Sequence, residues 1–202
     1  MAGAGRSSGR GFDRAHGVTT QALLTLGQLE PASGDAYVHA THYEPVPVEA
    51  FGELLAFVPE DLVRAAAFVD VGCGMGRALL LAAEHPFKQV VGIELSPALH
   101  AIARENFATA RGLALHCRDV RIRRGDARRF AFPKGDLVVF LFNPFDHEVL
   151  RVVLDRIVVS RHAGDRVTLL YHVPIHRDVV AKYVAQTLYD DRAGIVATLR
   201  VP

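Results

Sequence analysis

From residue 66 to the end of the chain, two patterns of hydrophobic positions alternate. Short apolar runs, of which residues 136–142 (DLVVFLF) are the clearest, are typical of parallel strands buried on both faces. Between these runs, apolar residues recur every three or four positions, as they do in amphipathic helices. The pattern predicts strands over 68–71, 89–95, 120–124, 136–142 and 166–173, and helices over 77–85, 97–111, 146–161 and 176–187.

The last part of the chain departs from this alternation. Residues 187–201 contain two strand-like runs about an Asp/Gly-rich turn at 190–194, which predicts an antiparallel hairpin. Strands that alternate with helices favour a parallel sheet with helices on both faces. We therefore expect an α/β fold: a single-domain, doubly wound, mostly parallel seven-stranded sheet with helices on both faces and a C-terminal antiparallel hairpin.

The first 60 residues carry weaker signals. Residues 1–16 are rich in Gly, Ser and Arg and have no periodicity, so we expect a disordered N-terminal arm. Its arginines could contact RNA or another acidic partner, although a solvated tail is the simpler interpretation. We expect one domain over 17–202, with N-terminal helices (19–30 and 47–58) and a lid segment at 17–60 and a Rossmann-like core at 66–202.

Composition and charge exclude some classes of protein. The chain has 202 residues and a net charge of +1, which argues against a surface dominated by nucleic-acid binding and leaves such a partner allowed but not indicated. No apolar run approaches the roughly 20 residues of a membrane span, and we see no signal peptide. Cys73 and Cys117 are too few for a disulfide framework and indicate reduced thiols in a cytoplasmic protein.

The most informative stretch is residues 70–77 (DVGCGMGR), which joins a predicted strand to a predicted helix. Alternate glycines let the backbone turn tightly and approach a ligand, and the helix N-terminus that follows favours an anionic group. A small charged cofactor is therefore expected here. The dinucleotide fingerprint G-x-G-x-x-G does not fit, because Arg77 stands where its third glycine belongs.

The same stretch, D-x-G-x-G-x-G, resembles the first motif of class I (seven-β-strand, Rossmann-like) S-adenosylmethionine-dependent methyltransferases, and the resemblance extends over about residues 43–202. It implies that S-adenosyl-L-methionine is the cofactor and S-adenosyl-L-homocysteine the product. It also implies that the turn holds the methionine part of the cofactor, with Asp70 near its amino group. The turn residues concerned are Gly72, Cys73, Gly74 and Gly76; a tight turn without a ligand is the plainer alternative.

The resemblance assigns two further pairs of residues to the cofactor. Glu94 ends the second predicted strand, where an acid of this family accepts the ribose hydroxyls, and Leu95 would lie near the adenine. Asp126 follows the third strand, where an acid commonly accepts from the adenine amino group while the backbone of its neighbour, Ala127, meets the ring. A surface acid at Glu94 and a turn acid at Asp126 are the alternatives.

Two short motifs point to the methyl acceptor and to a lid. Asn143-Pro144-Phe145 is similar to the N-P-P-(Tyr/Phe) motif of amino-methylating members, with one proline missing, and would position the acceptor beside the transferred methyl group. Alternatively, Asn143 caps the helix that starts at Asp146. His42-Tyr43-Glu44-Pro45 looks like the Tyr-x-Pro segment of some seven-strand protein-lysine methyltransferases, in which Tyr43 would cover the cofactor; a packed loop tyrosine is the alternative.

No metal site is expected. The pairs His39/His42 and His172/His176 lack a cysteine or acid at metal-ligand spacing. The sequence thus predicts an S-adenosylmethionine-dependent methyltransferase whose acceptor is unidentified, an amine of a protein or small molecule being one candidate. The alternative is a non-catalytic methyltransferase-like module that binds RNA or protein. The sequence leaves the oligomeric state open.

Overall fold

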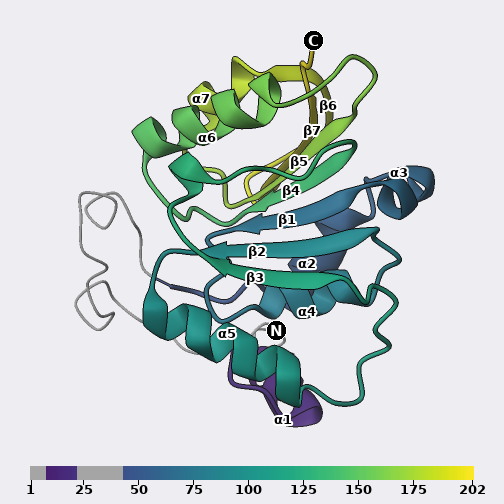
Figure 1. The fold of residues 1–202 in the computed structure, drawn as a ribbon, viewed down its shortest axis with the longest axis vertical. Helices are drawn as coiled ribbons and strands as arrows, with labels where there is room; N and C mark the ends of the chain where they lie inside the picture. The colour runs from purple at the N-terminus through teal and green to yellow at the C-terminus, as the bar shows by residue number, and fades with distance from the viewer. Residues whose placement is uncertain (1–7, 22–42) are drawn as a thin grey trace, which may run out of the picture.

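The structure is a computed structural model that describes residues 8–21 and 43–202 of the chain (Figure 1). Its centre is a seven-stranded sheet in the order β3-β2-β1-β4-β5-β7-β6. The first five strands are parallel, and β7 is antiparallel to both β5 and β6, which confirms the predicted fold. The strands are Ala67–Val71 (β1), Gln89–Glu94 (β2), Val120–Arg124 (β3), Leu137–Leu141 (β4), Val167–His172 (β5), Val184–Asp190 (β6) and Gly194–Leu199 (β7).

Helices cover both faces of this sheet. In Figure 1, α6 and α7 lie on one side of the strands, and α1, α2, α4 and α5 lie on the other. The helices are Ser8–His16 (α1), Val48–Leu55 (α2), Glu60–Ala65 (α3), Arg77–Ala83 (α4), Pro97–Thr109 (α5), His147–Val159 (α6) and Arg177–Ala181 (α7).

Two hydrophobic clusters explain why the central strands are buried on both faces. Phe68 of β1 belongs to a cluster with side chains of α1, α2, α3 and α4, while Val69 and Val71 pack in a second cluster with α6 and α7. All five residues of β1 and all five of β4 are therefore buried, as expected of strands with a helix layer on each side.

The strand order reverses between β1 and β4, since β2 and β3 lie on one side of β1 and β4 and β5 on the other. Crevices at the carboxyl ends of strands beside such a reversal are the usual ligand sites of open parallel sheets. The fold thus predicts the location of a site before any side chain is considered: the loops that follow β1, β2 and β4.

The N-terminal region differs from its prediction. The disordered arm expected over 1–16 is wrong for residues 8–16, which form α1. Tertiary contacts hold this helix: the Phe12 side chain is buried in the first cluster, and His16 Nδ1 lies 3.0 Å from the Arg111 carbonyl oxygen. Residues 1–7 lie outside the described residues. The helix predicted over 19–30 is not helical at 19–21, and its remainder also lies outside the described residues.

Two further predicted helices end early. The helix expected over 47–58 ends at Leu55, and a separate helix, α3, follows Pro59. The helix expected over 176–187 ends at Ala181, and the residues from Val184 onward form β6, an edge strand that pairs with β7. Pairing with β7 overrides the weak helical spacing of this segment. No helix among the described residues is long and apolar enough to cross a membrane.

Candidate active site

A cavity of about 1020 Å³, measured with its open mouth, lies at the carboxyl ends of β1, β2 and β4. Most of the residues that the sequence assigns to a cofactor line it: Tyr43, Asp70, Gly72, Cys73, Gly74, Glu94, Leu95, Asp126 and Ala127. Pro144 and Phe145 line it as well, whereas Gly76 and Asn143 are not among its lining residues. The residues expected to hold the cofactor thus come together at the place that the strand order indicates.

The glycine turn has the backbone for which its glycines are needed. Gly72 has a φ of 79° and Gly74 a φ of 53°, a region that side-chain-bearing residues rarely adopt. A Cβ atom at Gly72 would come within 2.3 Å of Pro144 Cβ, and one at Gly74 within 2.1 Å of the Tyr43 ring. Gly76 precedes α4 as its N-cap residue, so the first turn of this helix begins directly behind the cavity.

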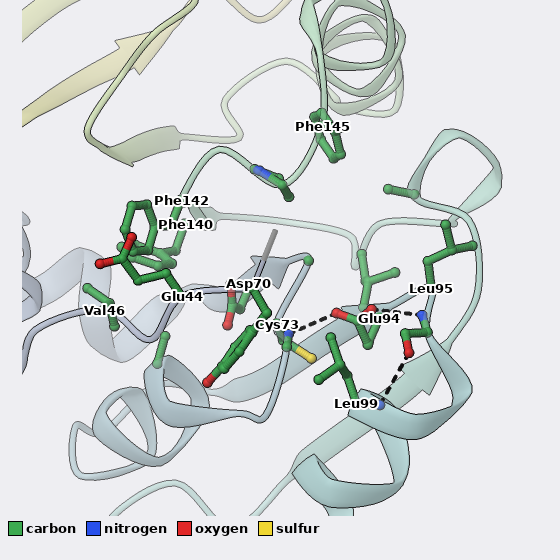
Figure 2. A pocket seen from close by; sticks show the side chains of 18 of the residues that line it. Glu44, Val46, Asp70, Cys73, Glu94, Leu95, Leu99, Phe140, Phe142 and Phe145 are labelled. Carbon is green, nitrogen blue, oxygen red and sulfur yellow. Dashed lines mark hydrogen bonds between the residues drawn. The ribbon is translucent and has the colours of Figure 1, made fainter. Parts of the chain in front are cut away.

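Glu94 fastens this turn to the next strand. Its carboxylate accepts hydrogen bonds from the backbone N–H of Gly74 and of Ser96, each at 2.8 Å, as the dashed lines of Figure 2 show. Burial raises the pKa of Glu94, and these N–H donors oppose the rise. A carboxylate has about four acceptor positions, so two remain for the hydroxyl groups of a ligand.

Asp70 and Cys73 lie near the middle of the cavity (Figure 2). Burial, reinforced by the nearby charge of Glu94, raises the pKa of Asp70 well above its usual range. A cationic group placed beside Asp70 would restore its ionised form, which makes this carboxyl a suitable partner for an ammonium group. Burial also raises the pKa of the Cys73 thiol, so this cysteine is not an activated nucleophile.

Asp126 is held in place by its own loop. Its carboxylate caps the 3₁₀ turn Ala127–Arg129 by accepting from Arg128 N–H at 2.9 Å, and it also accepts from the Arg128 guanidinium at 2.7 Å. Burial alone would raise the pKa of Asp126, but the hydrogen bonds from Arg128 outweigh burial and lower it. The carboxylate is therefore a preorganised acceptor at the cavity wall.

Tyr43 lies on the glycine turn, as a covering residue would. Its ring is close enough to Gly74 to leave no room for a Cβ atom, and its hydroxyl donates to the Thr20 carbonyl at 2.8 Å. The structure thus brings this tyrosine to the cavity from a segment 30 residues before the turn. Its contact with the cofactor stays a prediction.

The side chain of Asn143 faces the neighbouring loop. Its amide N–H donates to the Val173 carbonyl at 2.6 Å, and its Oδ1 accepts from the Tyr171 hydroxyl at 2.7 Å. Helix α6 is capped by Asp146, which accepts from the N–H groups of Glu148 and Val149, so the capping alternative for Asn143 is wrong. Asn143 and Val173 both have positive φ angles, 42° and 46°, and are joined by this hydrogen bond.

The sequence did not indicate several residues that line the cavity. Figure 2 shows Glu44, Val46, Phe140 and Phe142 on one side of Asp70, and Glu94, Leu95 and Leu99 on the other. The first group forms a second end of the cavity, which we call the aromatic end. A signal existed for Phe142, which closes the apolar run 136–142, but nothing in the sequence could show that Glu44 would line the same cavity.

Arg77 also has a role that the sequence did not reveal. Its side chain is 2% exposed and extends from the first turn of α4 toward Asp13 and Thr20 of the N-terminal region. Within residues 8–21 and 43–202, no group of three or more His, Cys, Asp or Glu side chains is placed to hold a metal ion. The histidine pair at 39 and 42 lies outside that range.

Comparison with known proteins identifies the type of domain to which this cavity belongs. Residues 68–159, which run from β1 to the end of α6, match the sequence model of a methyltransferase domain family. The chain has the class I methyltransferase fold. S-adenosyl-L-methionine is the methyl donor of this family, and the cavity fits it: the carboxyl groups of Asp70, Glu94 and Asp126 line it, and Gly72 and Gly74 contribute backbone without a side chain to its wall.

Solved structures with this fold include an RNA methyltransferase from Salinibacter ruber in complex with S-adenosyl-L-homocysteine. It is 22% identical, with a TM-score of 0.56 over 79% of this chain and 94% of that one. The N-methyltransferase NodS from Bradyrhizobium japonicum WM9 is 15% identical, with a TM-score of 0.54 over 76% and 95%. The ribosomal protein L11 methylase from Lactobacillus delbrueckii subsp. bulgaricus is 16% identical, with a TM-score of 0.55 over 76% and 80%.

These three proteins carry names that point to different acceptors, so the methyltransferase fold does not decide the acceptor of this chain. No curated protein sequence matches the chain. The aromatic end of the cavity is therefore the part of the structure that bears on the chemistry of the acceptor.

Proposed function

We propose that this protein is an S-adenosyl-L-methionine-dependent methyltransferase that methylates an amine. The observation that carries the proposal is the charge of the cavity wall. Its charged lining residues are four acids (Glu44, Asp70, Glu94 and Asp126) and two arginines (Arg77 and Arg128). Each arginine is bound to an acid, Arg77 to Asp13 and Arg128 to Asp126.

The aromatic end suits a cationic acceptor. Glu44 supplies a carboxylate, and the rings of Phe140 and Phe142 supply faces that attract an ammonium group. An anionic acceptor at this end would lie in the same cavity as the Glu44 carboxylate and would lose its hydration without compensation. The cavity thus favours an amine over a phosphate or a carboxylate.

The same residues prepare such an acceptor for reaction. S-adenosyl-L-methionine supplies an electrophilic methyl group, so the protein mainly has to align the acceptor and bring it in as a neutral amine. The ammonium nitrogen has to lose a proton before it can attack, and Glu44, at the same end of the cavity, is placed to accept this proton. Alignment in a closed site is worth roughly 7–11 kcal/mol of the barrier.

The direct test is methyl transfer from radiolabelled S-adenosyl-L-methionine to three acceptor sets: lysine-containing peptides, small alkyl amines and RNA. We expect label in one of the amine sets, with S-adenosyl-L-homocysteine formed in equal amount. Label found in RNA alone would overturn the amine assignment. Binding of S-adenosyl-L-homocysteine without methyl transfer to any of the three sets, or to a cell lysate tested as a fourth, would favour the non-catalytic alternative.

Glu44→Gln is expected to lower kcat/KM for the amine acceptor about tenfold or more, because it removes a charge worth ~1.5–3 kcal/mol in a charge-assisted contact. Affinity for S-adenosyl-L-homocysteine should not change, since Glu44 lies at the aromatic end. Steady-state kinetics and calorimetry measure the two effects separately. Glu49→Gln, on the exposed side of α2, is the matched control and should alter neither.

Asn143→Ala is expected to lower turnover more than cofactor binding. The substitution removes the bonds to Val173 and Tyr171 that hold the loop after β4 to the loop after β5. Tyr171→Phe removes the hydroxyl that bonds to Asn143 Oδ1 and to the backbone of Ile175 and His176 but leaves the Asn143–Val173 bond, and should lower kcat in the same direction by a smaller factor. If Tyr171→Phe has wild-type kcat while Asn143→Ala is inactive, Asn143 acts on the acceptor directly and not through this loop contact.

A further inference from the structure

Arg77 is a buried cation whose partners lie mostly in the N-terminal region. Its Nε donates to Thr20 Oγ1 at 2.7 Å, and its Nη2 donates to Asp13 Oδ1 and Gln21 Oε1, each at 3.2 Å. The guanidinium also lies 5.4 Å from the centre of the Phe12 ring. A buried guanidinium is tolerated only where its donors are satisfied, so α4 and the N-terminal region are held together at this point.

Asp13 and Thr20 complete the network. Asp13 Oδ2 accepts from the N–H groups of Thr20 and Gln21, both at 2.7 Å, and its Oδ1 accepts from the Thr20 hydroxyl. Thr20 is fully buried, and its carbonyl accepts from the Tyr43 hydroxyl. Every polar group of Thr20 is thereby engaged, and Thr20 connects Arg77 to the tyrosine that lies on Gly74.

A second buried side chain ties the same segment to the glycine turn. Asn106 of α5 accepts from Thr19 N–H at 2.8 Å and donates to the carbonyls of Thr19 and Met75, both at 2.9 Å. Met75 is part of the glycine turn, between Gly74 and Gly76. The segment 12–21 therefore contacts the turn through Asn106, through Arg77 and through Tyr43.

We infer that the segment 12–21 is a working part of the cofactor site, although Asp13 and Thr20 do not line the cavity. Asp13 and Arg77 are positioning residues: they hold Thr20, which in turn holds Tyr43 against Gly74. Docking of this segment and binding of the cofactor favour each other, and such coupling is reciprocal. The inference rests on the assignment of S-adenosyl-L-methionine to the cavity and does not depend on the methyl acceptor.

The test is a double-mutant cycle read out as the Kd of S-adenosyl-L-homocysteine by calorimetry. Asp13→Asn removes the negative charge that pairs with Arg77, and Tyr43→Phe removes the hydroxyl that bonds to the Thr20 carbonyl and to the Met75 backbone while keeping the ring. We expect each to raise Kd about tenfold, within the range typical of coupled sites. The double variant should be about as weak as the weaker single variant, far from the hundredfold that independent effects would give.

Asp136→Asn is a closely matched control. Asp136 is 16% exposed in its side chain and Asp13 is 15% exposed; each accepts from a backbone N–H and from an arginine. Asp136 directly precedes β4, at the amino ends of the parallel strands, whereas the cavity lies at their carboxyl ends. Its replacement is therefore expected to lower Tm without changing Kd. Wild-type Kd in Asp13→Asn, or multiplied effects in the double variant, would overturn the inference.

Amide hydrogen exchange gives a readout that does not depend on how well the variants fold. In the wild-type protein, S-adenosyl-L-homocysteine is expected to slow exchange at Thr19, Thr20 and Gln21, whose N–H groups are bonded to Asn106 and Asp13. Exchange that slows in the glycine turn but not at these three residues would contradict the coupling. If the wild-type protein does not bind S-adenosyl-L-homocysteine at all, the cofactor assignment itself fails.

Discussion

Gly74→Val is expected to abolish measurable binding of S-adenosyl-L-homocysteine and to lower Tm. Two effects combine at this position. The backbone has a φ of 53°, which costs a β-branched residue on the order of 1–3 kcal/mol. In addition, the new Cβ would lie 2.1 Å and 2.3 Å from two Tyr43 ring carbons, so either the ring or the turn has to move. Calorimetry and thermal unfolding of the purified variant measure the two consequences.

Two companion variants separate these effects. Gly135→Val has the same kind of backbone, with a φ of 83°, but nothing lies within 4 Å of its Cβ, and it is outside the cavity. It should lose stability and keep its cofactor affinity. Tyr43→Ala removes the ring that the new Cβ would meet but is itself expected to weaken binding, so it serves as the reference: adding Gly74→Ala to Tyr43→Ala should raise Kd by a smaller factor than adding it to the wild type. If the two factors are equal, the Cβ at position 74 does not act through the Tyr43 ring.

The core of this fold was predictable because its signals are local. A run such as 136–142 has to be a strand buried on both faces, and Ser96-Pro97 starts a helix in the structure as the sequence indicates, with Ser96 Oγ accepting from Leu99 N–H. Edge elements have weaker signals. Strand β6 is half exposed and has no apolar run: the sequence indicates its last residues as part of the hairpin, but its start at Val184 follows only from its pairing with β7.

The N-terminal helix could not be predicted, because its stability comes from distant partners. Its sequence, SGRGFDRAH, has poor helix formers, and an isolated helix of nine residues is marginal in water. What holds it is a set of contacts with residues about 60 to 100 positions away: Phe12 in the core, Asp13 on Arg77, and His16 against Arg111. A sequence pattern contains no information on such pairs.

The residues of the candidate site also divide into those whose position follows from local sequence signals and those whose orientation depends on distant contacts. The glycine turn, Glu94 and Asp126 follow strands, and parallel strands bring their carboxyl ends to one edge, so their meeting follows from the sequence. Asn143 shows the limit of this reasoning. It follows β4 as predicted, but a φ of 42° places its amide against Val173 and Tyr171. Spacing predicts the loop on which a residue lies and leaves the direction of its side chain open.

Glu94→Gln is expected to weaken S-adenosyl-L-homocysteine binding about 100-fold or more. The carboxylate accepts from Gly74 N–H and Ser96 N–H, and charge-assisted hydrogen bonds of this kind contribute roughly 1.5–3 kcal/mol each. A glutamine has one oxygen, so its NH₂ group would face one of the two N–H donors and repel it. The variant therefore disturbs the glycine turn and, in the same change, alters the carboxylate that we predict to accept from the ribose hydroxyls.

Two control variants test whether the loss of affinity for S-adenosyl-L-homocysteine comes from the contacts that Glu94 makes in the cavity. Glu84→Gln alters a carboxylate that accepts from Ala114 N–H at 3.3 Å, beyond the far end of α4 and outside the cavity, and is expected to keep wild-type affinity. Glu94→Asp retains the charge but is one methylene too short to reach both donors, so its affinity should fall between the wild type and Glu94→Gln. If Glu94→Asp binds as weakly as Glu94→Gln, the two-donor geometry decides affinity; if Glu94→Gln binds like the wild type, Glu94 holds neither the turn nor the ribose.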